Sequence, residues 1–196
     1  TNLRCHLLAD RSRSMTFGSC GYTKAEYAAT LAATLAYFLY LQGDAVGVLT
    51  FDEQIRDYLP ARHRTGHLRQ LMLALEKPAG GQATNLAAPL KRIVEIIRKR
   101  GVIVLLSDFL VPIDRLEPDL ITLTACGHEV IVFQVLDPEE LAFNFGAASM
   151  FEDVESGAAE LLLAQRDGEL GADIGKLRAE LDGLANKLSK ILLERL

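Results

Sequence analysis

The sequence is poor in the residues that mark disulfide-bonded and zinc-binding proteins. Among 196 residues there is no tryptophan, and the three cysteines are Cys5, Cys20 and Cys126. Their odd number, wide spacing and lack of a C-x-x-C pair indicate neither a disulfide framework nor a zinc knuckle. A reducing compartment fits best, so we expect a cytoplasmic protein. No secretory signal peptide is visible, and the chain opens almost inside a strand, as a piece of a longer protein would.

A membrane-spanning run is also missing. The candidate, residues 27–41, has only 15 residues and contains Thr30 and Thr34, whereas a transmembrane helix needs about 20 apolar residues. Lys24 and Glu26 close it on one side. We therefore favour a helix packed against a sheet over a membrane span.

Positive charge is not in excess. The chain has 21 Lys and Arg against 26 Asp and Glu, a formal net charge of -5, which gives no electrostatic reason to expect nucleic acid or an anionic membrane as a partner. The hydrophobic fraction of 49% and the charged fraction of 24% are those of a soluble globular protein. The length suits one domain with a core of its own, together with a helical appendage.

Strand and helix patterns alternate along the chain. Apolar runs predict strands at residues 3–9, 45–51, 54–59, 102–106, 129–136 and 150–154, and Pro60 is expected to end the third. Helical spacing predicts helices within residues 23–42, 62–75, 86–100 and 112–125, the first with a capping box of Thr23 and Glu26. Residues 137–140 are expected to form a short turn. The alternation indicates an α/β fold with a doubly wound, mostly parallel, Rossmann-like sheet covered by helices on both faces.

Hard oxygen ligands follow the first and fourth predicted strands. Asp10, Ser12 and Ser14 stand at alternate positions after the first strand, and Asp108 follows the fourth. In the common doubly wound order these strands are neighbours, and ligands bind at their carboxyl ends. A hydroxyl after a glycine pair, Thr84, could complete the set. Such oxygens suit Mg²⁺, Mn²⁺ or Ca²⁺ better than zinc or copper. The alternative is that the serines only shape a turn and that Asp10 caps the next helix.

The same residues carry a resemblance to a known family. The pattern D-x-S-x-S, a threonine in a glycine-containing loop and an aspartate after the fourth strand are similar to the metal-ion-dependent adhesion site of von Willebrand factor A domains. The match is closer to a bacterial family of uncharacterised A-like proteins, often encoded beside MoxR-type AAA+ ATPases. The residues that carry it are Asp10 to Met15, Thr23-Lys24, Gly43-Asp44, Val46-Gly47, Phe51 and Ser107-Asp108.

The resemblance covers about residues 3–155 and implies a ligand set. Ser12, Ser14 and Thr84 would bind the ion through hydroxyl oxygens, while Asp10 and Asp108 would bind it directly or through water. Two departures stand out: Asn85 follows the threonine where the family often has an acidic residue, and the segment that usually precedes the first strand is missing. The implied function is a metal-dependent protein-interaction module, an adaptor of a MoxR-type ATPase, in which a partner's acidic residue reaches the metal.

Two other functions stay open. One is a metal-dependent hydrolase or phosphotransfer enzyme that uses Asp10 or Asp108, and the other is a structural domain whose ion only stabilises loops. The enzyme motifs themselves are missing: Ser12 stands where a haloacid-dehalogenase-like phosphatase needs its second aspartate. There is also no G-x-S-x-G, P-loop or G-x-G-x-x-G, and no strand-end lysine of a receiver-like phosphoacceptor is evident.

Three smaller features are expected to have no binding or catalytic role. His63 and His67 are four residues apart, but Thr65-Gly66 between them favours a solvated loop over a metal site. The basic cluster Arg62, Arg64 and Arg69 is expected to be an exposed face, although it could meet an acidic partner or phosphates. Cys20 is expected to be only a small loop residue.

The last part of the chain differs in character. We expect a domain at residues 1–155 and a C-terminal helical segment at 156–196. Apolar residues at heptad spacing lie between Ile174 and Ile191, but four glycines weaken the pattern, each by about 0.8–1 kcal/mol in a helix interior. A helix packed back on the domain is favoured, and self-association or partner docking through residues 170–195 is the alternative.

Overall fold

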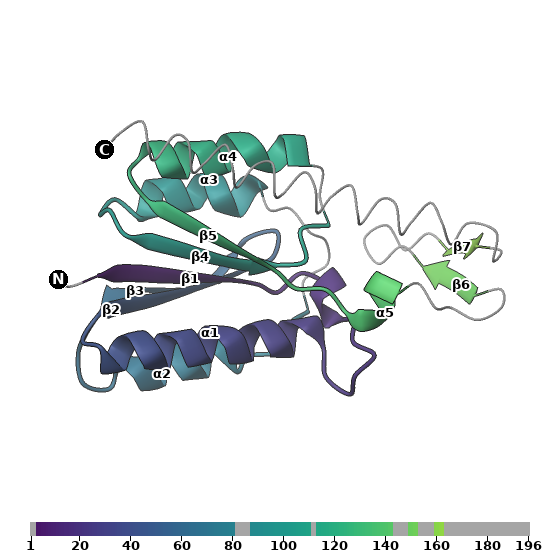
Figure 1. Ribbon diagram of the computed structural model, residues 1–196, viewed down its shortest axis with the longest axis horizontal. Coiled ribbons are helices and arrows are strands. Elements are labelled where there is room, and N and C mark those ends of the chain that lie inside the picture. Colours follow the sequence, from purple (N-terminus) through teal and green to yellow (C-terminus); the bar gives the residue numbers. More distant parts are fainter. Residues whose placement is uncertain (1–2, 81–86, 111–112, 143–148, 153–158, 163–196) are drawn as a thin grey trace.

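The computed structural model describes residues 3–80, 87–110, 113–142, 149–152 and 159–162 (Figure 1). Its elements, in chain order, are β1 (Arg4–Asp10), the 3-10 helix η1 (Ser14–Thr16), α1 (Lys24–Leu41), β2 (Ala45–Phe51), β3 (Ile55–Arg62), α2 (His67–Leu75), α3 (Ala87–Ile96), β4 (Val102–Ser107), α4 (Ile113–Ala125), β5 (Glu129–Gln134), α5 (Pro138–Ala142), β6 (Ser149–Glu152) and β7 (Ala159–Leu162).

The main sheet has five strands in the order β3-β2-β1-β4-β5. Strands β2, β1, β4 and β5 are parallel, and β3 returns antiparallel along β2. The predicted α/β sheet, mostly parallel, is confirmed. So is the prediction that the strands ending near Asp10 and Asp108 are neighbours, because β1 pairs directly with β4.

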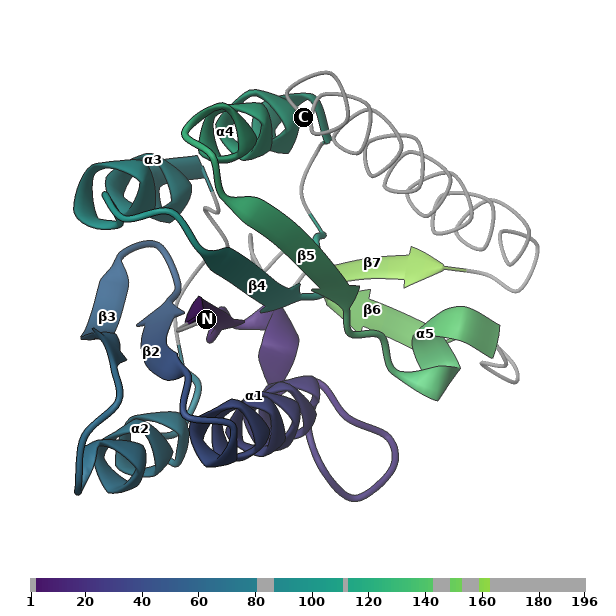
Figure 2. The ribbon, with the colours of Figure 1, turned by 60° about the vertical axis from the view of Figure 1, so that its left-hand side comes forward.

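Helices cover both faces of this sheet. Figure 2 shows α1 and α2 on one side and α3 and α4 on the other. The alternation of side chains along β1 explains the two layers: Leu7 packs into the core beneath α1 and α2, while Leu8 packs into the core beneath α3 and α4. Both leucines are fully buried. Every residue of β4 is buried, as a central parallel strand between two helical layers requires.

Helix α1 begins and packs as its sequence predicts. Thr23 and Glu26 form the expected capping box, each side chain accepting from the other's backbone N–H. Small side chains at spacings of three and four let the helix approach the sheet closely, namely Ala25, Ala28, Ala32 and Ala36. Within the described residues, no helix has the length and apolar character to cross a bilayer. The buried alanines of α1 share a core with Leu7 of β1 and Val48 of β2, so the helix packs on the sheet as we expected.

Some boundaries differ from the prediction. Strand β3 does not stop at Pro60 but continues to Arg62; it is an edge strand with a bulge opposite β2, where the missing N–H of a proline is tolerated. Helix α3 stops at Ile96, so the basic residues 98–100 form the connection to β4 and not a helix end. Residues 137–140 were expected to form a short turn, but Pro138–Ala142 make the short helix α5.

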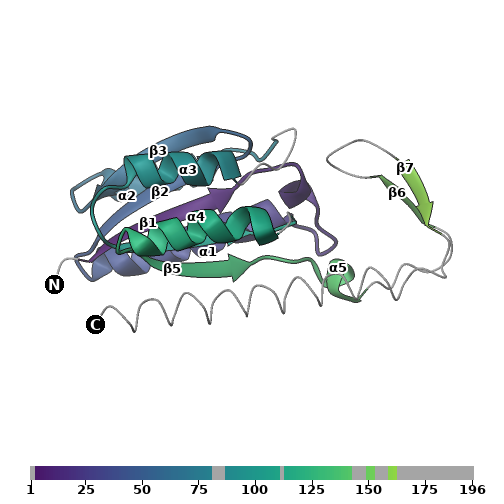
Figure 3. The same ribbon diagram turned by 90° about the horizontal axis from the view of Figure 1, so that it is seen from above.

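The end of the chain also differs. β6 was expected at the edge of the main sheet, but it pairs antiparallel with β7 in a separate two-stranded sheet (Figure 3). The expected boundary at residue 155 falls between these two paired strands, and residues 159–162 are a strand where a helix was predicted. The heptad pattern of residues 170–195 lies outside the described residues.

Candidate metal centre

The loop after β1 folds back on its own aspartate. Asp10 is the last residue of β1, and its Oδ1 accepts a hydrogen bond from the backbone N of Ser12 at 2.8 Å. The backbone N of Met15 then donates to the Ser12 carbonyl at 3.2 Å, which starts η1. This tight turn brings the Ser12 and Ser14 hydroxyl oxygens to 3.2 Å from each other. All three polar side chains are buried.

The end of β4 meets this loop from the neighbouring strand. The Ser107 hydroxyl donates to Asp10 Oδ2 at 2.5 Å and accepts from the Phe109 backbone N at 3.1 Å. Asp108 is buried, and its Oδ1 accepts from the Leu110 backbone N at 3.3 Å. Phe109 is fully buried with φ of 57°, the left-handed region that a bulky residue rarely adopts. A strained backbone of this kind is found mainly where surrounding structure enforces a functional geometry.

The two carboxylates act on each other electrostatically. Burial, together with the negative charge of Asp108, raises the pKa of Asp10 from 3.8 to about 6, although hydrogen bonds from Ser107 and Ser12 act against this. The site thus holds more negative charge than its neutral hydroxyls can offset. A cation at this position would favour the ionised form of Asp10.

One cation from the protein already lies there. The Lys24 Nζ, on the first turn of α1, is 2.9 Å from Asp108 Oδ2 and 2.6 Å from Glu140 Oε1 on α5. Burial lowers the pKa of Lys24, but the attraction of Asp108 and Glu140 outweighs it and the net shift is upward. The sequence pointed to Lys24 only as part of the family resemblance and gave it no role at the site, because only the fold brings Asp108 within its reach.

A chain of hydrogen bonds extends from Lys24 to the loop after β1. Glu140 Oε2 accepts from the Asp137 backbone N at 2.8 Å. Asp137 in turn accepts from the backbone N of Ser19 at 2.8 Å and from its hydroxyl at 2.5 Å. The ends of β1, β4 and β5 are therefore tied together through α1 and α5.

The predicted ligand set is brought together in part. The structure places Asp10, Ser12, Ser14 and Asp108 at the carboxyl ends of β1 and β4, whereas Thr84 lies outside the described residues. Among the described residues no three His, Cys, Asp or Glu side chains gather into a metal-binding group; the candidate set has two carboxylates, and its other donors are hydroxyls. The excess negative charge and the all-oxygen donor set fit a hard divalent cation, with Lys24 as its competitor for Asp108.

The other residues considered from the sequence have different surroundings. His63 is exposed and its ring packs on Tyr40, with centroids 4.6 Å apart. His67 is buried at the start of α2, where its Nε2 lies 2.9 Å from the Val46 carbonyl oxygen. They do not form a shared site. Cys20 is exposed, and its sulfur lies 3.7 Å from the Ser19 hydroxyl.

Exposed apolar side chains surround the carboxyl edge of the sheet. They come from the loop after β1, the first turns of α1, the segment after β4, and α5. Their exposed fractions lie between 38% and 53%: Phe17 38%, Tyr22 51%, Tyr27 50%, Leu110 41% and Leu141 53%. Of these, Tyr22 and Tyr27 stack on each other, with ring centroids 6.2 Å apart.

Fold and site define an α/β protein with an open sheet and a charged site at the point where the strand order reverses. Residues 1–177 match the family described as protein of unknown function DUF58, and the chain belongs to this family. Relatives include uncharacterized proteins of Mycobacterium bovis and Mycobacterium tuberculosis, each 30% identical over 159 residues, or 79% of this chain. The chain spans about half of their length, 49% in both cases.

Two solved structures share the fold. A conserved hypothetical protein BatB from Bacteroides thetaiotaomicron aligns with a TM-score of 0.60 and 17% identity, covering 96% of this chain and 100% of that one. An aerotolerance-related membrane protein from Bacteroides fragilis aligns with a TM-score of 0.57 and 16% identity, covering 95% and 100%. At such identities the likeness concerns the fold alone.

Proposed function

We propose that this chain is a metal-dependent protein-interaction module of the von Willebrand factor A type. The ligands are Asp10, Ser12, Ser14, Asp108 and, from outside the described residues, Thr84. The observation that carries the proposal is the burial of two carboxylates beside two serine hydroxyls at the ends of adjacent strands. Mg²⁺ is the first choice of metal, with Mn²⁺ and Ca²⁺ as alternatives.

The proposed partner is another protein that supplies an acidic residue. A divalent cation held by only two carboxylates and neutral hydroxyls keeps positive charge and coordination positions for an incoming carboxylate. The exposed apolar side chains around the site, such as Tyr22, Tyr27 and Leu141, would provide the surrounding contact. A MoxR-type AAA+ ATPase in the cytoplasm is the partner that the family resemblance implies, and the ATPase link rests on that resemblance alone.

Access to the site requires a local rearrangement. Asp10 and Asp108 have exposed fractions of 0%, so a partner's carboxylate must approach after the surrounding segments part. The Lys24 contacts with Asp108 and Glu140 are the charged ones that hold α1, β4 and α5 together here. A divalent cation at Asp108 would compete with Lys24 for that carboxylate.

Thermal unfolding with and without metal is the first test. An ion at a hundred times its dissociation constant stabilises the folded state by about 2.7 kcal/mol, so the midpoint of the wild type should rise by several degrees on replacing EDTA with Mg²⁺. Asp10→Asn and Ser12→Ala should reduce this rise. Glu95→Gln, an exposed carboxylate on α3, is the matched control and should keep it. Equal rises in all four proteins would refute the ligand set.

Partner capture separates an interaction module from a domain that uses the ion for stability only. Immobilised wild type should retain a purified MoxR-type ATPase in Mg²⁺ and release it in EDTA, and Asp10→Asn should not retain it. If metal raises the unfolding midpoint but does not support capture of the ATPase, the ion only stabilises the domain and the adaptor role is rejected.

A metal-dependent phosphotransfer or hydrolytic activity of Asp10 or Asp108 is the second candidate. Lys24 favours it, because its ammonium group lies 2.9 Å from Asp108, although it comes from the start of α1 and not from a strand end. The test is turnover of acetyl phosphate and p-nitrophenyl phosphate in Mg²⁺. Activity that is lost in both Lys24→Met and Asp10→Asn would favour the enzyme over the interaction module.

A further inference from the structure

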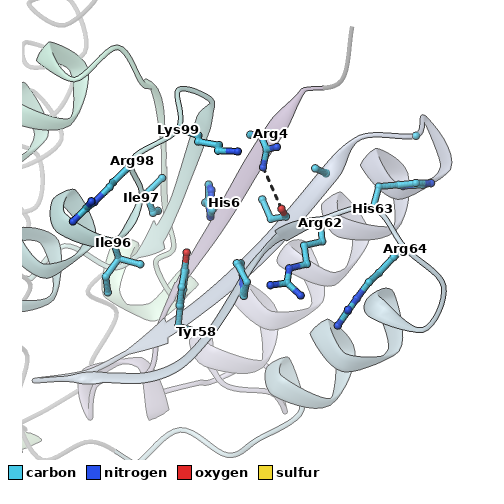
Figure 4. Close-up of a pocket in the computed structure, with 14 residues that line it drawn as sticks. Arg4, His6, Tyr58, Arg62, His63, Arg64, Ile96, Ile97, Arg98 and Lys99 are labelled. Atoms are coloured by element: carbon cyan, nitrogen blue, oxygen red, sulfur yellow. Dashed lines mark hydrogen bonds between the residues drawn. The ribbon is translucent and has the colours of Figure 1, made fainter.

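A second charged region lies at the opposite, amino edge of the main sheet. A cavity of about 730 Å³ opens there between the start of β1, the end of β3 and the connection from α3 to β4 (Figure 4). Its volume is within the range of about 300–1,000 Å³ of small-molecule sites. Five basic residues line it, namely Arg4, Arg62, Arg64, Arg98 and Lys99.

The cations that surround the cavity come from three distant segments. In Figure 4, Arg4 and Lys99 lie at its upper rim and the Arg62 side chain runs downward from β3, while Arg64 and Arg98 lie at its two flanks. Arg4 is anchored by a hydrogen bond from its Nη1 to the Ala61 carbonyl at 3.5 Å. The basic cluster noted in the sequence supplies only Arg62 and Arg64, because Arg69 does not line the cavity. Arg4, Arg98 and Lys99 come from other segments.

No acidic residue lines the cavity. The fourteen lining residues include neither Asp nor Glu, and among the described ion pairs none uses Arg4, Arg62 or Lys99. Asp44 is adjacent in sequence to two of the lining residues, but its Oδ1 accepts from the Leu3 backbone N at 3.0 Å. The chain as a whole has a net charge of -5, but five of its positive charges lie around this cavity. They raise the concentration of anions at the cavity.

The remaining walls provide one buried polar group and an apolar surface. His6 is 6% exposed, and burial, with the charges of His128 and Arg4, lowers its pKa to about 4, so the ring is neutral at pH 7. Its neutral imidazole offers one N–H donor and one acceptor. Ile96, Ile97 and the Tyr58 ring supply apolar wall.

We propose that this cavity binds an anion that carries two or more phosphate groups, held by Arg4, Arg62 and Lys99. A guanidinium group donates two parallel hydrogen bonds to a phosphate, and a phosphate carries up to two charges. A single carboxylate would offset only one of the three cations. The site is independent of the metal centre, which lies at the other edge of the sheet. A free polyphosphate compound and a diphosphate lipid headgroup share this chemistry.

Pyrophosphate and lipid vesicles distinguish the two sources. Calorimetric titration with pyrophosphate in EDTA and low salt should give saturable binding to one site, since salt screens exposed cations. Sedimentation with cardiolipin vesicles, against phosphatidylcholine vesicles, tests the lipid source. Binding of either probe supports the proposal and names the source.

Matched variants tie the binding to the cavity. Arg62→Gln and Lys99→Gln, both exposed and hence compatible with folding, should each weaken binding about tenfold, the size of one hydrogen bond to a charged group. Arg69→Gln, exposed on α2 outside the cavity, should leave it unchanged. The proposal fails if neither probe binds, if Arg69→Gln loses as much as the others, or if a glutamate-rich peptide binds more tightly than pyrophosphate.

Discussion

The two ends of the same sheet handle charge in opposite ways. At the carboxyl edge, the buried carboxylates of Asp10 and Asp108 have partners inside the protein, the Ser107 hydroxyl and the Lys24 ammonium. At the amino edge, Arg62 and Lys99 are exposed around an open cavity without an acidic lining residue. A buried charge must be compensated within the fold, whereas an exposed charge is stabilised by water until a ligand binds.

Breaking the buried pair should have the largest effect. Lys24→Met leaves Asp108 buried without its cation, and removing one partner of a buried ion pair costs about 3–5 kcal/mol. Urea unfolding in EDTA measures the change in the free energy of unfolding. The control is Arg92→Met, whose pair with Glu95 is exposed on both sides and is worth at most about 1 kcal/mol. Equal losses in the two variants would contradict the contrast between buried and exposed charge.

Acid should destabilise the amino end of β1 through His6. Its pKa is lowered from 6.5 to about 4 by burial and by the charges of His128 and Arg4. The unfolded chain therefore binds this proton first, so the stability that neutral His6 contributes is complete above pH 6.5 and is lost as the pH falls toward 4. The loss is up to about 3 kcal/mol. Urea unfolding of wild type and His6→Gln from pH 7 to 4.5 should show a steeper decline in the wild type, and parallel curves would count against the shift.

The carboxyl end of the same strand should respond with the opposite sign. The pKa of Asp10 is raised from 3.8 to about 6 by burial and by Asp108, so the unfolded chain loses this proton first. Stability from protonated Asp10 is therefore present below pH 3.8 and is lost as the pH rises through 6, by about 2–3 kcal/mol.

The Asp10 effect is measured against its own amide variant. In EDTA, the stability of the wild type relative to Asp10→Asn should fall between pH 4 and 7, and Mg²⁺ should reduce that fall. A difference between the two proteins that does not change with pH would argue against a raised pKa.

The smallest effect concerns the backbone beneath the basic cavity. A Cβ at Gly101 would lie 2.3 Å from the Arg4 carbonyl oxygen, so Gly101→Ala must push β1 and the connection before β4 apart. We expect a loss of about 1–3 kcal/mol in unfolding free energy and weaker pyrophosphate binding, because Arg4 moves. Gly80→Ala, where the added Cβ meets nothing within 4 Å, is the control and should do neither.

Local sequence signals predicted most of the sheet and its helices. The apolar runs at β1, β2 and β4, the Thr23 capping box and the alternation of strands with helices were sufficient for an α/β fold with Asp10 near Asp108. They failed where tertiary pairing overrides local preference. Pro60 predicted the end of a strand, but β3 is an edge strand, where a proline without an N–H need not break a hydrogen bond to a neighbouring strand. The strand at 149–152 pairs with 159–162 in place of the main sheet.

By itself, the sequence determined the chemistry that each strand end carries: an aspartate with alternating serines after β1, an aspartate after β4, and basic residues near 62 and 98. Only the tertiary structure decided which of these groups meet. Lys24 reaches Asp108 from 84 positions away, and Arg4, Arg62 and Lys99 gather at one cavity. The physical reason is that hydrophobic burial fixes the order of the strands, and the order of the strands sets the distances between charges that the sequence keeps far apart.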